Sequence, residues 1–404
     1  MIRVHRRPLR LGAAVLIAGL LAAGCGSPTS SAKGQVQEST TTSTIAKGPD
    51  TTAAQLRTRL NGLFEEHVYL VSAASGAAEG GRTDEFNAAV AALAGNSGSL
   101  TDNFTAVFDA TAGKTFDGLW RKHVDLLLSY AQTKSAQALS DLAQYTKDFG
   151  AFINSALPSL PAAAVTGLVA THVQTLKAII DAQAAGNETE AYTNERAAAA
   201  HMNTVAANLT GAIAKKFPDK IGGDPASGGA DLITTLTVAL RENVFLTCAA
   251  TDAALGARND ELTAARAALD NNSAALADAI AGIYGSGAGT TFSPLWSKHI
   301  GFFVDYATAF GTKQQTKADE AMGNLLQVSQ DLGAFINMSS PKISKDSAAA
   351  LFKTHVSAVK DVIDAQAAKV FTRAYTAERV AADQISTIAT TLAPLIVAQF
   401  PNKY

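Results

Sequence analysis

The chain has 404 residues, of which 47% are hydrophobic and 17% charged, so it is long and apolar enough for two folded domains. Its 33 lysines and arginines and 35 aspartates and glutamates leave a formal net charge of −2, which excludes a dominating basic surface and gives a nucleic-acid partner no support. Frequent alanine, only 11 prolines and the lack of β-branched runs favour helices, so we expect an all-α protein.

Residues 1–24 have the organisation of a secretion signal. Arginines are concentrated in residues 1–10, and an apolar run over 11–21 is long enough for a signal core but too short to span a bilayer. The sequence LAAGC that ends at Cys25 then resembles the lipobox of bacterial lipoproteins, which implies that Cys25 becomes a lipid-modified N-terminus. An ordinary signal peptide followed by a chance cysteine is the alternative. The pair Arg6-Arg7 is similar to a twin-arginine signal, so the export route stays open between Sec and twin-arginine.

Residues 25–51 form a Ser/Thr-rich tether without apolar periodicity. The lipoprotein resemblance implies an extracytoplasmic protein that is anchored to the membrane by the lipid on Cys25. We expect no later segment to be apolar enough to span a bilayer. If Cys25 is acylated, Cys248 has no disulfide partner, and its apolar helical surroundings predict a small buried thiol.

The rest of the chain contains a tandem repeat. FDGLWRKH at 116–123 and FSPLWSKH at 292–299 lie 176 positions apart, and GAFIN recurs at a distance of 183, at 150–154 and 333–337. So many matches at two distances exclude chance. We call residues 52–217 the first copy and residues 230–404 the second copy, and we expect each to fold as a helical bundle. Residues 218–229 are rich in proline and glycine and form the expected linker.

Apolar residues at helical spacing predict six helices in the first copy, and no stretch alternates as a strand would. The GNSG sequence at 95–98 is expected to break the second helix near its middle. Four long helices should form the core of an antiparallel bundle, with shorter ones packed on it. The expected helices cover residues 53–78, 84 onward with the break, 115–132, 135–156, 162–185 and 188–216.

Trp120 and His123 share the apolar face of one helix, and Trp296 and His299 do the same in the second copy. Each tryptophan is expected to be a structural core residue. Counting a rise of 1.5 Å per residue places four histidines of the first copy at similar depth on four different helices. Imidazoles in a bundle core suit copper or zinc, and haem iron is a weaker alternative. The candidate metal ligands are His67, His123, His172 and His201.

The second copy retains His299 and His355 but has Asn243 and Gln384 at the other two positions. A site of three or four imidazoles is therefore predicted only in the first copy. The alternative is a purely structural role, in which buried histidines fix the helix register through hydrogen bonds.

Two further repeated features are polar. Asp181 and its counterpart Asp364 are expected in structural ion pairs rather than as carboxylates that orient a histidine. Glu195-Arg196 and Glu378-Arg379 are repeated acid–base neighbours that cannot face each other on one helix, so each of these residues is expected to bridge to another helix.

No catalytic motif is present. The spacings of a nucleophile elbow, a zinc protease, a haem attachment site and a di-iron bundle are all missing. We therefore expect a non-catalytic binding or interaction module of the cell envelope, with a metal ion or an envelope protein as its partner. A purely structural surface lipoprotein is the alternative.

The motif F-x-x-L-W-x-K-H, the Asn-Ser pairs at 96–97 and 272–273, and T-H-V followed by IDAQAA are similar to a helical repeat of secreted and lipid-anchored Gram-positive proteins. Some of those proteins are labelled copper amine oxidase-like. The resemblance covers both copies and implies a connection with copper. An amine oxidase of that kind needs a tyrosine in an Asn-Tyr-Asp/Glu motif within a large β domain. Neither is present, so amine oxidation is not carried over.

Overall fold

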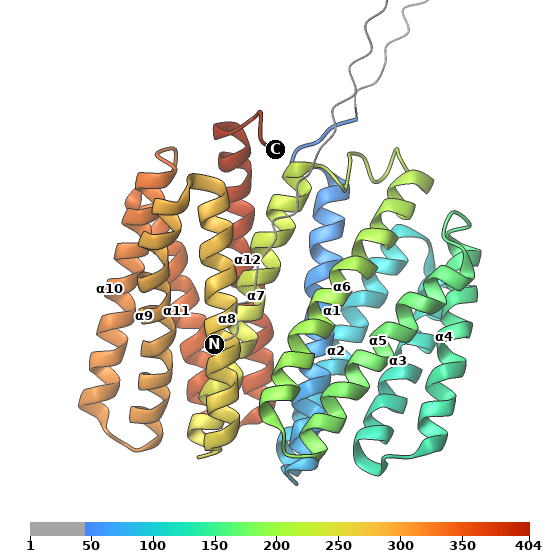
Figure 1. The fold of residues 1–404 in the computed structure, drawn as a ribbon, viewed down its shortest axis with the longest axis horizontal. Helices are drawn as coiled ribbons and strands as arrows, with labels where there is room; N and C mark the ends of the chain where they lie inside the picture. Colours follow the sequence, from blue (N-terminus) through green and yellow to red (C-terminus); the bar gives the residue numbers. More distant parts are fainter. Residues whose placement is uncertain (1–44) are drawn as a thin grey trace, which may run out of the picture. The chain divides into compact units, whose positions relative to one another are not determined.

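The computed structural model describes residues 45–404, and these residues form one compact unit. They fold into twelve α-helices and no strand, as Figure 1 shows, so the all-α prediction is confirmed for this part of the chain. The predictions about the signal peptide and Cys25, and most of the tether, lie outside the described residues.

The helices of the first copy are α1 (Thr52–Glu79), α2 (Thr83–Val107), α3 (Ala110–Thr133), α4 (Ala136–Ala156), α5 (Ala162–Ala184) and α6 (Glu188–Lys216). Those of the second copy are α7 (Gly228–Leu255), α8 (Asn259–Tyr284), α9 (Ser286–Gly311), α10 (Gln315–Ser339), α11 (Lys345–Ala367) and α12 (Phe371–Gln399). Their lengths lie between 21 and 29 residues. The expectation of four long helices with shorter ones packed on them is therefore wrong.

The expected break in the second helix is also wrong, because α2 runs without interruption through residues 95–98. The amide of Asn96 donates to the carbonyl of Leu63 on α1 at 2.9 Å, and the hydroxyl of Ser97 donates to the carbonyl of Leu93 at 2.8 Å. These bonds satisfy the polar side chains inside an intact helix, so the backbone has no need to leave the helical path.

Helices α1 and α7 hold the central positions. Helix α1 packs against α2, α3, α5 and α6, and α7 packs against α8, α9, α11 and α12. The two also pack against each other, with α6 against α8 on one side and α2 against α12 on the other. One hydrophobic core therefore extends through both copies, and the division of the chain into two separate domains stays a prediction.

Where α1 meets α7, side chains contact their own counterparts from the repeat. The hydroxyl oxygens of Thr58 and Thr234 are 3.1 Å apart, and the ring of Tyr69 stacks on that of Phe245 with centroids 4.9 Å apart. Both pairs are 176 positions apart in the chain. Such contacts between counterparts are typical of an approximate two-fold relationship across an interface.

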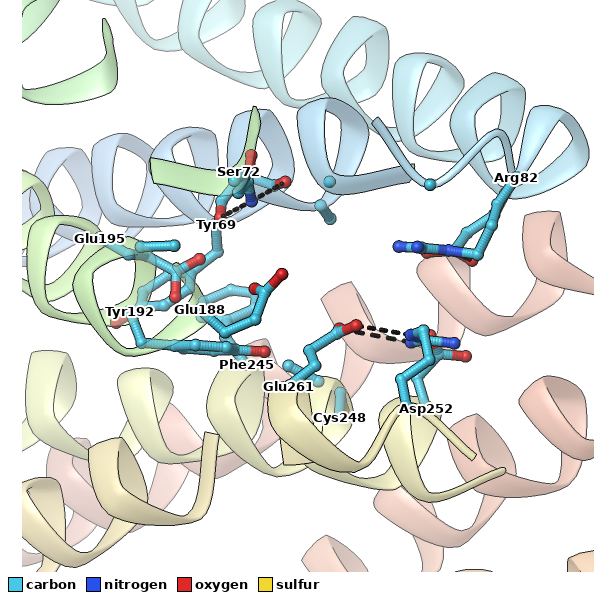
Figure 2. A pocket seen from close by; sticks show the side chains of 18 of the residues that line it. Tyr69, Ser72, Arg82, Glu188, Tyr192, Glu195, Phe245, Cys248, Asp252 and Glu261 are labelled. Atoms are coloured by element: carbon cyan, nitrogen blue, oxygen red, sulfur yellow. Dashed lines mark hydrogen bonds and ion pairs between the residues drawn. The ribbon is translucent and has the colours of Figure 1, made fainter. Parts of the chain in front are cut away.

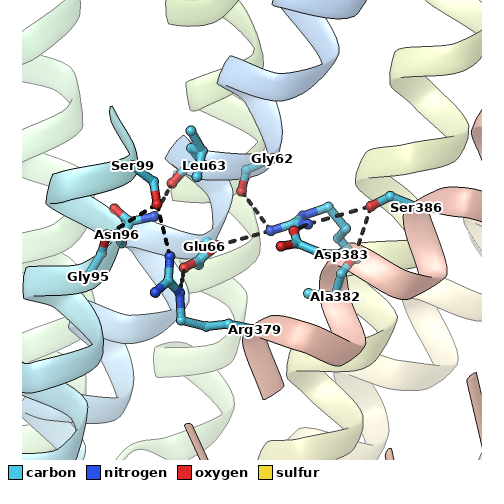
Figure 3. A network of polar contacts seen from close by, with 11 residues as sticks. Gly62, Leu63, Glu66, Gly95, Asn96, Ser99, Arg379, Ala382, Asp383 and Ser386 are labelled. Carbon is cyan, nitrogen blue, oxygen red and sulfur yellow. Dashed lines mark hydrogen bonds and ion pairs between the residues drawn. The ribbon is translucent and has the colours of Figure 1, made fainter. Parts of the chain in front are cut away.

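Ion pairs flank this contact on both sides. Figure 3 shows Glu66 of α1 beside Arg379 of α12, and its second partner Arg241 of α7 lies 3.1 Å away. Glu242 of α7, the counterpart of Glu66, accepts from Arg196 of α6 at 2.7 Å. The prediction of bridges to other helices is confirmed for both arginines, whose bridges join the first copy to the second. It is wrong for Glu195 and Glu378, which form no ion pair within the described residues.

Three helices are long and apolar enough to cross a membrane by length and composition: α5, α7 and α12. The expectation that no later segment would meet this criterion is therefore wrong, because stretches rich in alanine, valine and leucine raise the apolar content of ordinary core helices as well. Each of the three packs along other helices of the described unit, and α7 carries Arg241 and Glu242 in ion pairs.

Candidate metal centre

Three histidines of the first copy converge in its core. They come from three helices, His67 from α1, His123 from α3 and His172 from α5, and one ring nitrogen of each lies within 4.8 Å of the others. The Nε2 atoms of His67 and His123 are 3.2 Å apart. Within residues 45–404 this is the one group of at least three histidine, cysteine or acidic side chains that converges in this way.

Aromatic side chains enclose the group. The indole of Trp120 lies 4.4 Å from the ring of His123 and 5.0 Å from that of His67, measured between centroids. Tyr145 of α4 stacks on His123 at 5.0 Å. The three histidines are at most 3% exposed and Trp120 is also buried, which confirms its predicted place in the core. The imidazoles therefore lie in a dry, apolar environment.

Most of the ring nitrogens have no hydrogen-bonding partner among the described residues. Only the two Nε2 atoms of His67 and His123 meet each other, whereas the Nδ1 atoms of both rings and both nitrogens of His172 are unpaired. A buried polar group without a partner costs about 1–3 kcal/mol. The second copy also leaves three nitrogens of His299 and His355 unpaired, so what distinguishes the first copy is the convergence of three imidazoles.

Burial also fixes the protonation state of these histidines. It lowers the pKa of His123 to about 3, and it lowers the pKa values of His67 and His172 well below the ordinary range. Neighbouring histidines lower the last two further by charge repulsion. All three rings are therefore neutral near pH 7, which is the form of histidine that binds metal ions.

The fourth predicted ligand, His201, is not part of this group. Its Nε2 donates to the carbonyl of Leu168 on α5 at 2.9 Å. Its counterpart Gln384 makes the same bond to the carbonyl of Leu351 at 3.2 Å. Glutamine is a poor substitute for histidine as a transition-metal ligand but donates the same hydrogen bond in the second copy. We therefore interpret both side chains as hydrogen-bond donors that join two helices. The candidate set of metal ligands is thus corrected from four histidines to three. Counting residues along the helices predicted how far along the bundle His201 lies, but not the side of α6 from which its ring projects.

The second copy has two imidazoles at the corresponding place. The rings of His299 on α9 and His355 on α11 are 5.4 Å apart, and Trp296 packs beside His299 at 5.1 Å. Asn243 on α7 instead donates to Asn272 at 3.0 Å. Burial lowers the pKa of His299 to about 3 and that of His355 well below its usual range. A set of three converging imidazoles is found only in the first copy of the described chain.

The repeated aspartates lie away from the histidines. Asp181 accepts a hydrogen bond from Tyr130 at 2.7 Å and pairs with Lys177, and Asp364 accepts from Tyr306 at the same distance. Each aspartate thereby joins the third and fifth helices of its copy. The prediction of structural ion pairs is confirmed.

Sequence reasoning missed a second feature, a cavity of about 460 Å³ where the two copies meet, which we call the junction cavity. Figure 2 shows part of its lining, with Tyr192 and Glu195 from α6 and Cys248 from α7. Cys248 is a free, buried cysteine, as predicted. The only sequence signal for the cavity was the repeated glutamate at positions 195 and 378, and nothing in the sequence indicated that both line one space.

Comparisons of this chain with protein-family models, with curated proteins and with solved structures found no match.

Proposed function

We propose that the protein is a non-catalytic binding module that holds one transition-metal ion, copper or zinc, in its first copy through His67, His123 and His172. The observation that carries the proposal is the convergence of three buried, neutral imidazoles from three different helices within 4.8 Å. No carboxylate belongs to the group, so nothing there resembles a calcium or magnesium site.

The spacing of the nitrogens suits one shared ion. Bonds from imidazole to such metals are about 2 Å long, so two nitrogens on one ion lie roughly 3.3–3.5 Å apart in tetrahedral or trigonal geometry. The nitrogens of His67 and His123 are already 3.2 Å apart. A nitrogen of His172 lies within 4.8 Å of both, and a change in the orientation of its ring toward them would complete the set.

Charge favours copper in its monovalent state over zinc. Three neutral ligands leave the charge of the ion uncompensated, and the cost of burying a charge rises with its square. Zinc also needs a fourth ligand, usually water, whereas the rings that pack against His123 are those of Trp120 and Tyr145. Haem is not favoured, because ring centroids only 5.0–5.9 Å apart leave no slot for a porphyrin among these histidines.

The proposal extends to location. The lipobox-like sequence ending at Cys25 and the Ser/Thr-rich tether after it support a lipid-anchored protein on the outer side of the membrane. There the first copy would meet metal ions outside the cytoplasm or pass them to an envelope partner.

A structural role of the histidines is the second candidate, and one observation favours it. His299 and His355 pack at the corresponding place of the second copy without a third imidazole, so paired histidines are tolerated there as core residues. Titration of the purified protein with copper(I) separates the two candidates. One bound ion per chain that is lost in His172→Ala and kept in His201→Gln supports the metal site, whereas no binding by the unaltered protein leaves the structural role.

A further inference from the structure

The junction cavity is a second candidate site, and none of the buried histidines lines it. Helices α1, α6, α7, α8 and α12 supply most of its walls, so both copies contribute. Figure 2 shows Glu188, Glu195 and Tyr192 together on one side of the space, with Arg82 across from them. We propose that the junction cavity binds a small organic cation that carries two amino groups.

The lining is strongly acidic. Eight aspartates and glutamates face two arginines, and neither lysine nor histidine is present in the lining. Arg82 is already paired with Glu85 at 2.7 Å, and Arg258 is paired with both Asp252 and Glu261. The charges of the arginines are thus compensated by their own partners. The remaining carboxylates therefore favour a positively charged ligand.

Four of those carboxylates form no ion pair with any residue of the described chain: the exposed Asp260, and Glu188, Glu195 and Glu378. Glu195 is only 5% exposed and Glu378 only 9%. The neutral side chain of Ser72 lies within hydrogen-bonding reach of Glu195, and that of Cys248 within reach of Glu378. Burial penalises the ionised form of a carboxyl group that has no cation beside it, and an ammonium group of a ligand would stabilise that form.

Burial acts on the protonation of both glutamates. It raises the pKa of Glu195 to about 8 and that of Glu378 well above its usual range. A positively charged ligand that enters the cavity favours the ionised carboxylates and forms charge-assisted hydrogen bonds with them.

Aromatic rings favour an organic cation over a bare metal ion. Tyr69, Phe245, Tyr192 and Tyr375 line the cavity, and the faces of such rings attract ammonium groups. The carboxylates of the lining do not converge on one point in the way that the three histidines do. A volume of about 460 Å³ also lies within the range of small-molecule sites and far exceeds the needs of one ion.

The repeat explains why two amino groups fit. Glu195 on α6 and Glu378 on α12 are counterparts, 183 positions apart, and each lies beside the corresponding residue of a central helix, Ser72 on α1 and Cys248 on α7. The cavity therefore has an equivalent acidic group from each copy. A linear diamine offers one ammonium group to each.

Calorimetric titration of the purified protein with 1,4-diaminobutane and with spermidine tests the proposal. The neutral analogue 1,4-butanediol has the same length without charge, and calcium chloride supplies charge without an organic body. We expect one diamine per chain, no heat from the diol, and at least about tenfold weaker diamine binding in Glu195→Gln and in Glu378→Gln. Asp270→Asn removes an exposed charge on α8 outside the cavity and should leave the affinity unchanged.

Glutamine keeps the shape and hydrogen bonding of a protonated glutamate, so both cavity variants should remain folded. Several results would overturn the proposal: no binding of either amine, equal binding of the diol, full affinity in both glutamine variants, or binding of calcium without binding of amine. His172→Ala should bind the diamine as the unaltered protein does. The outcome is therefore independent of the proposed metal site.

Discussion

The Nε2 atoms of His67 on α1 and His123 on α3 lie 3.2 Å apart, although the residues are 56 positions apart in the chain. Two neutral imidazoles satisfy such a contact by sharing one proton, with one ring donating and the other accepting. The same distance suits two ligands of one metal ion. The contact alone therefore fits both a structural hydrogen bond and a pair of metal ligands. His172, which has no partner on either nitrogen, is the residue that separates them.

Removing that third imidazole should weaken metal binding selectively. We expect His172→Ala to lower the affinity for copper(I) by at least about a hundredfold, because two imidazoles remain where three converged. His201→Gln is the matched control, since Gln384 already makes the equivalent bond in the second copy. Competition with a chromophoric copper chelator measures both affinities. Equal losses in the two variants would contradict the three-histidine site.

Adding an imidazole to the second copy should create a second site. Asn243→His places a ring beside His299 and His355, at the position that His67 holds in the first copy. Asn272 loses one contact but keeps its bond to the carbonyl of Ala239. We expect the metal content to rise from about one to about two ions per chain. A folded variant that binds no additional ion would show that three imidazoles at this place are insufficient.

The buried histidines should make stability depend on pH. The pKa of His299 is about 3 in the folded protein and about 6.5 in an unfolded chain, so the unfolded state binds protons first as the pH falls. The favourable contribution of the neutral ring is complete above pH 6.5 and is lost progressively toward pH 3. In the presence of a metal chelator, the stability of His299→Phe relative to the unaltered protein should rise by about 1.4 kcal/mol for each pH unit below 6.5. A difference in urea unfolding that does not change with pH would contradict this.

Glu195 should make the stability depend on pH in the opposite direction to the buried histidines. Its folded pKa is about 8, against 4.5 in the unfolded chain, because burial disfavours its charge and Glu242 on α7, Glu261 on α8 and Glu188 on its own helix repel it. Ser72 on α1 opposes this by hydrogen bonding. As the pH rises from 4.5 to 8, the unfolded state ionises first and the protein loses stability.

Glu195→Gln removes this loss. The variant should match the unaltered protein at pH 4 and exceed its stability at pH 8, with a difference that grows by up to about 1.4 kcal/mol per pH unit between these values. Glu320→Gln removes an exposed carboxylate on α10 and serves as the control for the loss of one carboxyl group. Urea unfolding at both pH values measures the effect, and a difference that shrinks as the pH rises would refute the assignment.

The buried ion pairs between the copies should contribute more to the free energy of unfolding than the more exposed pairs do. Glu66 is 2% exposed and accepts from both Arg241 and Arg379. Glu66→Gln removes the shared partner of both arginines, although Arg241 keeps Asp383 at 2.7 Å, so the free energy of unfolding should fall by about 3 kcal/mol, the lower end for a broken buried pair. Asp117→Asn breaks the half-exposed pair with Arg121 and should lower the free energy of unfolding by less than about 1 kcal/mol. Equal, small losses would mean that Glu66 does not stabilise the contact.

Sequence reasoning predicted the helix ends well where the chain carries local signals. The last helix of the first copy begins at Glu188 and ends at Lys216, as expected, and Ser135 caps α4 with its hydroxyl. It failed at residues 95–98, because the partner that satisfies Asn96 is a carbonyl on α1. That partner is known only once the two helices are packed.

The candidate site shows the same limit. Helical spacing placed His67, His123 and His172 on buried faces, but the direction of each face around the bundle depends on packing angles. His201 has the same helical spacing, but its ring bonds to the carbonyl of Leu168 and does not join the other three histidines. The junction cavity was missed altogether because its lining comes from helices of both copies, and the repeat indicates which residues correspond but not which ones meet.

X-ray absorption spectroscopy of the copper-loaded protein tests the central claim most directly. We predict a shell of about three nitrogen neighbours at about 2 Å, with the multiple scattering of imidazole rings, and a reduced or absent shell in His172→Ala. A first shell of oxygen or sulfur atoms, or an identical spectrum from His172→Ala, would contradict the proposal that His67, His123 and His172 bind the ion.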